Sequence, residues 1–110
     1  MIKLIASDMD GTLINSSHQI SSGNLSAIRR AQESGIEFAI ATGRDYSMVK
    51  PFLDKYELKC EAIVMNGAEY RDCNGEVIES IGIEKSKVKA VIEEILKESS
   101  IVDIYTSEGV

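Results

Sequence analysis

The sequence contains few of the features that mark a special class of protein. It has one proline, no tryptophan and no apolar stretch longer than a few residues. Apolar stretches this short cannot cross a bilayer, so we expect no membrane partner. The chain begins with one lysine and a short apolar run that Asp8 ends, and we expect no signal peptide there.

An excess of positive charge is also missing. Twelve Lys and Arg residues stand against eighteen Asp and Glu residues, which gives a formal net charge of -6. Proteins that bind nucleic acids normally present a basic surface to the phosphates, and here the basic residues are scattered. We therefore expect no nucleic-acid partner.

Cysteine is nearly absent as well. Cys60 and Cys73 form neither a CxxC pair nor a disulfide framework. This usage predicts reduced thiols without a redox role, in a cytoplasmic protein.

What remains is the composition of a globular protein. Of the 110 residues, 44% are hydrophobic and 27% are charged, which excludes disorder, collagen and coiled coil. The length allows one domain or part of one.

The first 68 residues alternate between short apolar runs and amphipathic segments. This alternation predicts βαβαβ units and hence an α/β fold with a Rossmann-like parallel sheet. We expect Ser21 to cap the first helix, Gly35 to end it, and Pro51 to kink or delay the second. The predicted strands are residues 2–6, 36–41 and 62–65, and the predicted helices are 22–34 and about 45–56.

The pattern changes after residue 68. Short strand-like runs at 69–72 and 76–80 flank Asn74-Gly75, and such a pair between strands predicts a β-hairpin. Apolar residues at helical spacing predict a helix over 85–98, and the run 101–105 predicts a last strand.

Polar and glycine residues follow each of the three predicted parallel strands. Because the carboxyl ends of parallel strands meet at one edge of a sheet, and ligands bind there, these residues should line one crevice. They are Asp8 and Asp10, then Thr42 and Gly43, then Asn66 and Gly67.

This crevice could support phosphoryl transfer. Asp8 and Asp10 point to the same side of an extended chain, and two close carboxylates favour a bound cation such as Mg²⁺. One aspartate could attack phosphorus and the other could protonate the leaving oxygen and later activate water. Thr42 and the amides around Gly43 could hold phosphoryl oxygens.

The first segment has alternative interpretations. Asp8 to Gly11 could be only a polar turn after a strand. A calcium-binding EF-hand starting at Asp8 fails, since Leu13 and Gln19 occupy the positions that need Gly and Glu. Neither a GxxxxGK[ST] phosphate loop nor a GxGxxG motif occurs.

Two motifs nevertheless resemble a known family. The segment Asp8-Met9-Asp10-Gly11-Thr12-Leu13 resembles the first motif of the haloacid dehalogenase (HAD) superfamily of phosphohydrolases, and Ala41-Thr42-Gly43-Arg44 resembles its second motif. Together with Asn66-Gly67-Ala68 they are similar to the Cof-type subfamily, which contains Mg²⁺-dependent phosphatases of sugar phosphates and other small phosphorylated metabolites.

The resemblance implies a role for each matching position. Asp8 would be the nucleophile and a Mg²⁺ ligand, and Asp10 would be the general acid and base and a second ligand through its carbonyl. Thr42 would bind the transferring phosphoryl group, with Met9, Gly43 and Arg44 beside it. Asn66 and Gly67 would lie near the substrate.

The resemblance also implies a division of the chain. Residues 1–81 would be the N-terminal part of a HAD core, and 82–110 the truncated start of an αβ (C2-type) cap. The family also uses a lysine and an acidic pair beyond the cap, and Lys85, Lys87 and Lys89 are more typical of a solvated helix face. We therefore expect an N-terminal fragment that is inactive alone.

Further hypotheses concern assembly and class. Without strands beside it, the run Ile2 to Ala6 would be an exposed apolar edge, which predicts self-association. A non-catalytic assembly module and a phosphomutase of the same superfamily remain open. A signalling receiver domain fits less well, because Asn66 stands where its phosphoacceptor aspartate would be.

Overall fold

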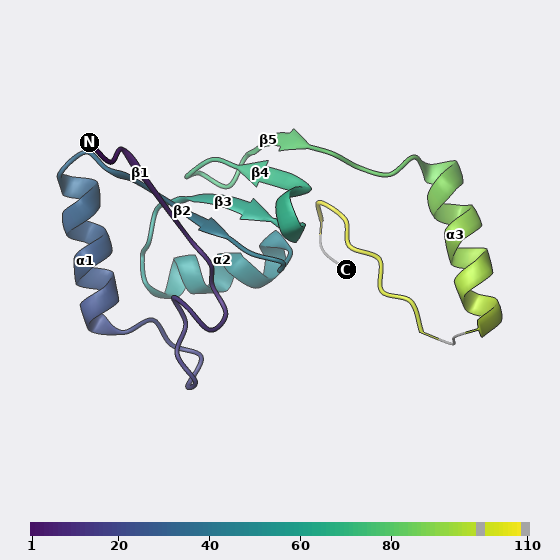
Figure 1. The fold of residues 1–110 in the computed structure, drawn as a ribbon, viewed down its shortest axis with the longest axis horizontal. Coiled ribbons are helices and arrows are strands. Elements are labelled where there is room, and N and C mark those ends of the chain that lie inside the picture. Colours follow the sequence, from purple (N-terminus) through teal and green to yellow (C-terminus); the bar gives the residue numbers. More distant parts are fainter. Residues whose placement is uncertain (99–100, 109–110) are drawn as a thin grey trace.

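The computed structural model describes residues 1–98 and 101–108, and its centre is one mixed sheet (Figure 1). The strands lie in the order β1-β2-β3-β4-β5, with β1, β2 and β3 parallel and β4 and β5 antiparallel. Their bounds are Leu4–Ser7, Glu37–Ala41, Glu61–Val64, Glu69–Arg71 and Val77–Ser80. The predicted α/β sheet with an added hairpin is confirmed.

Two capped helices connect the parallel strands. Helix α1 (Ser22–Glu33) begins after Ser21, whose hydroxyl accepts a hydrogen bond from the Asn24 amide at 3.1 Å, as predicted. Helix α2 (Tyr46–Lys55) follows Asp45, whose carboxylate accepts from the Ser47 amide at 3.0 Å. Pro51 lies inside α2 and does not delay its start.

The core lies between the sheet, α1, α2 and the loop after β1. Ile28 contributes from α1, Val49 and Leu53 from α2, and Phe38 and Ile40 from β2. The rest of the buried cluster is Met9, Leu13, Ile14, Ile20, Leu58, Cys60, Ala62 and Val64. One continuous core therefore fixes the loops that follow the parallel strands.

The hairpin forms where the sequence predicts it. The Asp72 carboxylate accepts hydrogen bonds from the amides of Asn74 and Glu76, and Gly75 has a φ of +85°. Glycine adopts this left-handed conformation without a Cβ penalty, which explains its place in the turn.

Helix α3 (Lys85–Glu98) stands apart from the sheet (Figure 1). It has the predicted bounds, and none of its residues is buried. The strand predicted at 101–105 is wrong: these residues are irregular and do not belong to the five-stranded sheet, whose neighbouring strands supply the backbone hydrogen bonds that a strand needs. Gly109 and Val110 lie outside the described residues.

Strand β1 is an edge of the sheet. Its only strand neighbour within the described residues is β2, and Ile2, Leu4 and Ile5 are exposed. Within the same residues, no helix has the length and apolar character needed to cross a membrane.

Candidate active site

A cavity of about 360 Å³ lies at the carboxyl ends of the three parallel strands. Asp8 reaches it from β1, Thr42 and Gly43 from β2, and Asn66 and Gly67 from the loop after β3. Ala41 and Ile63 complete its lining. The topology thus brings together residues from three separate segments, as the strand pattern predicts.

The loop after β1 is anchored from below by its apolar residues. Met9 is fully buried in the core and Leu13 is buried beside it, while Asp8 and Asp10 are exposed. The Met9 amide donates to a carboxylate oxygen of Asp8 at 2.7 Å, and the Met9 carbonyl accepts from the Ile14 amide at 2.9 Å. Burial of Met9 therefore holds the two aspartates on the solvent side.

The loops after β2 and β3 are joined through their main chains. The Thr42 amide donates to the Ile63 carbonyl, the Asn66 amide to the Thr42 carbonyl, and the Met65 amide to the Arg44 carbonyl, at 2.9, 3.1 and 2.9 Å. The Thr42 hydroxyl oxygen accepts from the Arg44 amide at 3.1 Å. These bonds fix one loop against the other.

The β3 loop contains three consecutive left-handed residues. Met65, Asn66 and Gly67 have φ angles of 50°, 55° and 93°. A side chain in this region costs on the order of 1–3 kcal/mol, and such strain gathers at functional sites. The turn also brings the Asn66 side chain against Gly43, where an added Cβ would meet the amide oxygen at 3.1 Å.

Arg44 clamps Asp10 with two hydrogen bonds. Its Nε and Nη2 donate to the two carboxylate oxygens at 2.7 and 2.6 Å. These bonds lower the pKa of the Asp10 carboxyl, with burial opposing and the Arg44 charge adding to the effect. Since 52% of the Asp10 side chain is exposed, solvent screens the ion pair and weakens it. The two side chains can therefore move apart.

The oxygen atoms of this edge fit part of a Mg²⁺ shell. Mg²⁺ binds proteins through one or two carboxylates and keeps water or substrate phosphate as its other ligands. The Asp8 carboxylate and the Asp10 main-chain carbonyl are of the required type. Within residues 1–98 and 101–108, no three His, Cys, Asp or Glu side chains gather as a metal site, so the side chains in hand supply a partial shell.

The structure sorts the residues singled out from the sequence. Asp8, Thr42, Gly43, Asn66 and Gly67 share the cavity. Asp10 faces Arg44 beside it, and Met9 can contribute only its main chain, because its side chain is buried.

Two features were not predicted from the sequence: the main-chain hydrogen bond from Met65 to Arg44 and the N-cap at Asp45. The Asp45 cap has a sequence signal, an aspartate two residues before a serine at a helix start. The left-handed Met65 has none, because bulky residues disfavour that conformation.

Comparison with known proteins assigns the fold and the motifs to one family. The sequence profile of the haloacid dehalogenase-like hydrolases matches residues 5–110. The chain belongs to this family. The resemblance carried by the first and second motifs is thereby confirmed.

Relatives of this HAD-family chain include named phosphatases. Phosphatase YwpJ of Bacillus subtilis (strain 168) is 34% identical over 109 residues, which are 99% of this chain and 38% of YwpJ. The 5-amino-6-(5-phospho-D-ribitylamino)uracil phosphatase YcsE of the same strain is 41% identical over 78 residues, 71% of this chain and 31% of YcsE.

Solved structures agree with this assignment. A haloacid dehalogenase-like hydrolase from B. subtilis matches with a TM-score of 0.83 and 37% identity, over 88% of this chain and 34% of that one. The HAD-family chain thus spans less than two fifths of the length of these relatives.

Proposed function

We propose that this chain supplies the nucleophile and the phosphoryl-binding loops of a Mg²⁺-dependent phosphatase acting on small phosphorylated metabolites, sugar phosphates in particular. The supporting observation is the cavity that Asp8 shares with Thr42, Gly43 and Asn66 at the carboxyl ends of the parallel strands. YwpJ and YcsE are also named as phosphatases, and the substrate in the name of YcsE is a phosphorylated sugar-alcohol derivative.

Asp8 acts as the nucleophile in this proposal. Its carboxylate oxygen attacks phosphorus, the bond from phosphorus to the ester oxygen breaks, and an aspartyl-phosphate forms. Asp10 gives a proton to the departing ester oxygen, and then takes one from the water that attacks the aspartyl-phosphate. Inorganic phosphate leaves, and both aspartates return to their starting states.

The neighbouring loops hold the phosphoryl group during both steps. The Thr42 hydroxyl and the Gly43 main-chain amide donate hydrogen bonds to its oxygens, and the Met9 amide does so once it releases the Asp8 carboxylate. Bound Mg²⁺, held by the Asp8 carboxylate and the Asp10 carbonyl, supplies positive charge that offsets the charge of the phosphate.

Arg44 has to leave Asp10 for this chemistry to proceed. While both hydrogen bonds are made, Asp10 is held as a carboxylate and cannot donate a proton. An incoming phosphate competes for the same guanidinium, because arginine binds phosphate and carboxylate with the same fork of donors. Substrate entry thus frees Asp10, which takes up a proton from solvent before it acts as the acid, and places a cation at the substrate.

The division at residue 81 belongs to the same proposal. Residues 1–81 are part of the catalytic core, and 82–110 begin a cap, since α3 stands apart from the sheet without a buried residue. The lysine and acidic pair that the family uses have no counterpart in these 110 residues. We expect little or no turnover by this chain alone, because phosphoryl transfer depends on positioning and charge stabilisation.

Self-association through β1 is the corresponding proposal for the partner. An unpaired edge with exposed Ile2, Leu4 and Ile5 can pair with the same edge of a second chain. Sedimentation at micromolar concentration should show dimers that Leu4→Lys removes and that Leu96→Lys, on exposed α3, leaves in place. A compact monomer under these conditions would contradict the proposal.

The function is tested by Mg²⁺-dependent hydrolysis of a generic phosphate monoester, with the intact mass of the 110-residue chain checked at 12.1 kDa. A longer chain that joins residues 1–110 to the lysine and the acidic pair of the family should turn over, and its Asp8→Asn variant should lose activity by at least about a thousandfold, because the nucleophile is gone. The matched control is Asp103→Asn, an exposed aspartate outside the sheet, which should keep full activity.

The 110-residue chain is measured beside it. We expect no turnover, but incorporation of one phosphoryl group from a small acyl phosphate, lost in Asp8→Asn. Undiminished hydrolysis by the longer chain with Asp8→Asn would refute the assignment of the nucleophile.

A further inference from the structure

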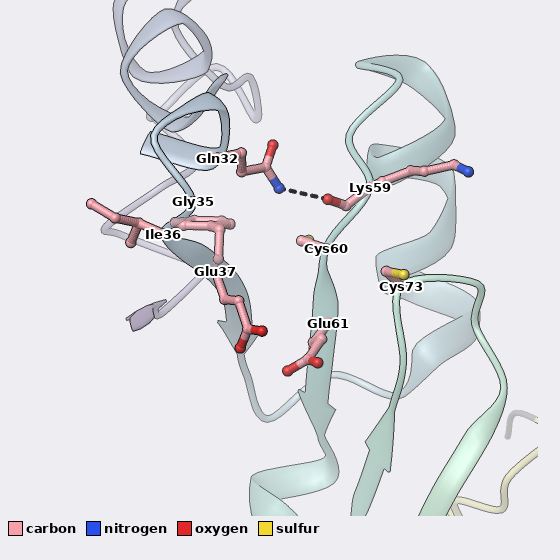
Figure 2. A pocket seen from close by; sticks show the side chains of 9 residues that line it. Gln32, Gly35, Ile36, Glu37, Lys59, Cys60, Glu61 and Cys73 are labelled. Carbon is pink, nitrogen blue, oxygen red and sulfur yellow. Dashed lines mark hydrogen bonds between the residues drawn. The ribbon is translucent and has the colours of Figure 1, made fainter. Parts of the chain in front are cut away.

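The two cysteines lie together at the end of the sheet opposite the site. Both line a second cavity of about 310 Å³. Figure 2 shows it between the segment before β2, the start of β3 and the end of β4. Cys60 directly precedes β3 and is buried, and Cys73 follows β4 in the hairpin turn and is exposed. Thirteen positions of sequence separate them, so their spacing alone did not indicate a pair.

The register of β3 and β4, extended past the ends of both strands, relates the two cysteines. Strands β3 and β4 pair Val64 with Glu69, Ile63 with Tyr70 and Ala62 with Arg71. Continuing this antiparallel register by two positions sets Cys60 against Cys73. This alignment follows from the strand pairing and from no motif in the sequence.

Both cysteines also line the same cavity. Side chains alternate along a strand, so Cys60 shares the face of Ala62 and of its partner Arg71, which stacks on Tyr46 of α2 at 4.3 Å. Cys73 lies two residues beyond Arg71, in the turn that the Gly75 amide closes on the Asp72 carbonyl at 3.0 Å. Opposite residues of an antiparallel pair have Cβ atoms about 4.5–5.5 Å apart. A disulfide needs about 3.5–4.5 Å, which a small shift at the end of a ladder provides.

We propose that Cys60 and Cys73 are a redox site that closes to a reversible intramolecular disulfide when the chain meets a low-molecular-weight disulfide such as oxidised glutathione. The Cys73 thiolate attacks the glutathione disulfide, forms a mixed disulfide and releases one glutathione thiolate. The Cys60 thiolate then attacks the Cys73 sulfur and releases the second. Two protein thiols lose two protons and two electrons, and one glutathione disulfide becomes two glutathiones.

Accessibility fixes the order of these steps. Cys73 is exposed and meets the oxidant first, whereas Cys60 is buried. Burial raises the pKa of the Cys60 thiol to about 12, a hydrogen bond with the Ile40 backbone opposes this, and Cys73 and Glu61 raise it further. The second step is therefore slow at neutral pH and accelerates about tenfold per pH unit as the thiolate fraction grows.

Other charged or titratable groups surround the two cysteines, and they do not reverse the rise in the pKa of the Cys60 thiol. Glu37, Lys59 and Glu61 line the same cavity, and Tyr46 of α2 interacts electrostatically with Cys60. Gln32 closes the cavity from α1 through a 2.7 Å hydrogen bond from its side-chain amide to the Lys59 carbonyl (Figure 2). The cavity gives the hairpin turn room to move toward β3.

The bond would act on the catalytic end of the sheet through the chain it encloses. The loop from Cys60 to Cys73 contains β3, the left-handed turn at Met65–Gly67 and β4. A disulfide that closes this loop lowers the conformational entropy of the unfolded chain. The oxidised chain should therefore unfold at a temperature about 10 °C higher, as a crosslink at unstrained positions does in a small domain.

The test is incubation of the 110-residue chain with oxidised glutathione, followed by intact mass and a non-reducing tryptic map. We expect a mass loss of about 2 Da, no reactive thiol after unfolding, and a linked pair of the peptides 60–71 and 72–85. Dithiothreitol should restore both thiols. The rate of closure should rise with pH between 7 and 9.

Two variants separate the steps. Cys60→Ala should stop at a single glutathione adduct on Cys73, and Cys73→Ser should remain unmodified while folded. The wild-type map decides the matter even if Cys60→Ala fails to fold. A stable Cys73 adduct on the wild-type chain, or a dimer linked through Cys73, would overturn the proposal.

Discussion

Two amphipathic helices of this chain differ in how far their apolar residues are buried. In α2, Leu53 is 8% exposed and packs in the core, whereas in α3 Leu96 is 52% exposed. Both helices carry apolar residues at helical spacing, and both are formed with defined bounds. The periodicity of apolar residues therefore indicates which face of a helix favours burial. A neighbouring element has to provide the apolar surface that covers this face.

The same contrast holds for ion pairs. Arg71 binds Glu69 at 2.6 Å in the packed part, with the Glu69 side chain fully buried. Lys87 and Glu84, at the start of α3, lie 3.1 Å apart with both side chains mostly exposed. Charge in a core depends on its partner, while charge on a solvated helix is stabilised by water.

The largest expected effect comes from breaking the buried pair. Arg71→Ala leaves the Glu69 carboxylate buried without its cation and should lower the free energy of unfolding by about 3–5 kcal/mol. Lys87→Ala, the matched change on α3, should lower it by at most about 0.5 kcal/mol. Urea denaturation of both variants measures the two changes in the free energy of unfolding. Equal changes would contradict the difference between the buried and the exposed pair.

A smaller effect is expected from the two leucines. Leu53→Ala removes a buried side chain and leaves a cavity, which should cost about 2–4 kcal/mol. Leu96→Ala removes an exposed one and should change the free energy of unfolding by less than about 0.5 kcal/mol. A large loss for Leu96→Ala would mean that α3 is covered in solution.

Two glycines provide a third contrast. Gly67 has a φ of +93° in the loop after β3, so Gly67→Ala should cost about 1 kcal/mol through strain, although no atom lies within 4 Å of the added Cβ. Gly82, in the link to α3, has no such backbone constraint. Gly82→Ala should be neutral or slightly stabilising in the same denaturation assay, since it restricts the unfolded chain.

The smallest effect should follow from removing the second region. A chain ending at residue 81 loses α3 and the hydrogen bond from Arg71 to the Ser107 carbonyl, and keeps the whole buried cluster. Calorimetry should find its unfolding temperature within about 5 °C of that of the 110-residue chain. A drop of 15 °C or more would show that the second region supports the core.

Most of the fold could be read from local signals. Ser21 and Gly35 bound α1, Asn74-Gly75 marks the hairpin, and the apolar runs mark β1, β2 and β3. These signals work because capping and turn chemistry act between residues close in sequence. The strand predicted at 101–105 failed for the opposite reason, since a strand depends on a distant partner.

The candidate site divides in the same way. The positions of Asp8, Thr42 and Asn66 after three parallel strands predicted a shared crevice, because topology brings such ends together. The clamp of Arg44 on Asp10 could not be predicted, since 34 positions separate them and the arginine could equally have pointed at a substrate.

The sequence by itself determined the family, the order of helices and parallel strands, and the residue types of the site. It did so because motifs, caps and turns are encoded in neighbouring residues. Tertiary structure alone decided that Arg44 holds Asp10, that Cys60 and Cys73 line one cavity, and that α2 is buried while α3 is exposed. Each of these depends on which distant segments pack together, and packing is a property of the folded chain as a whole.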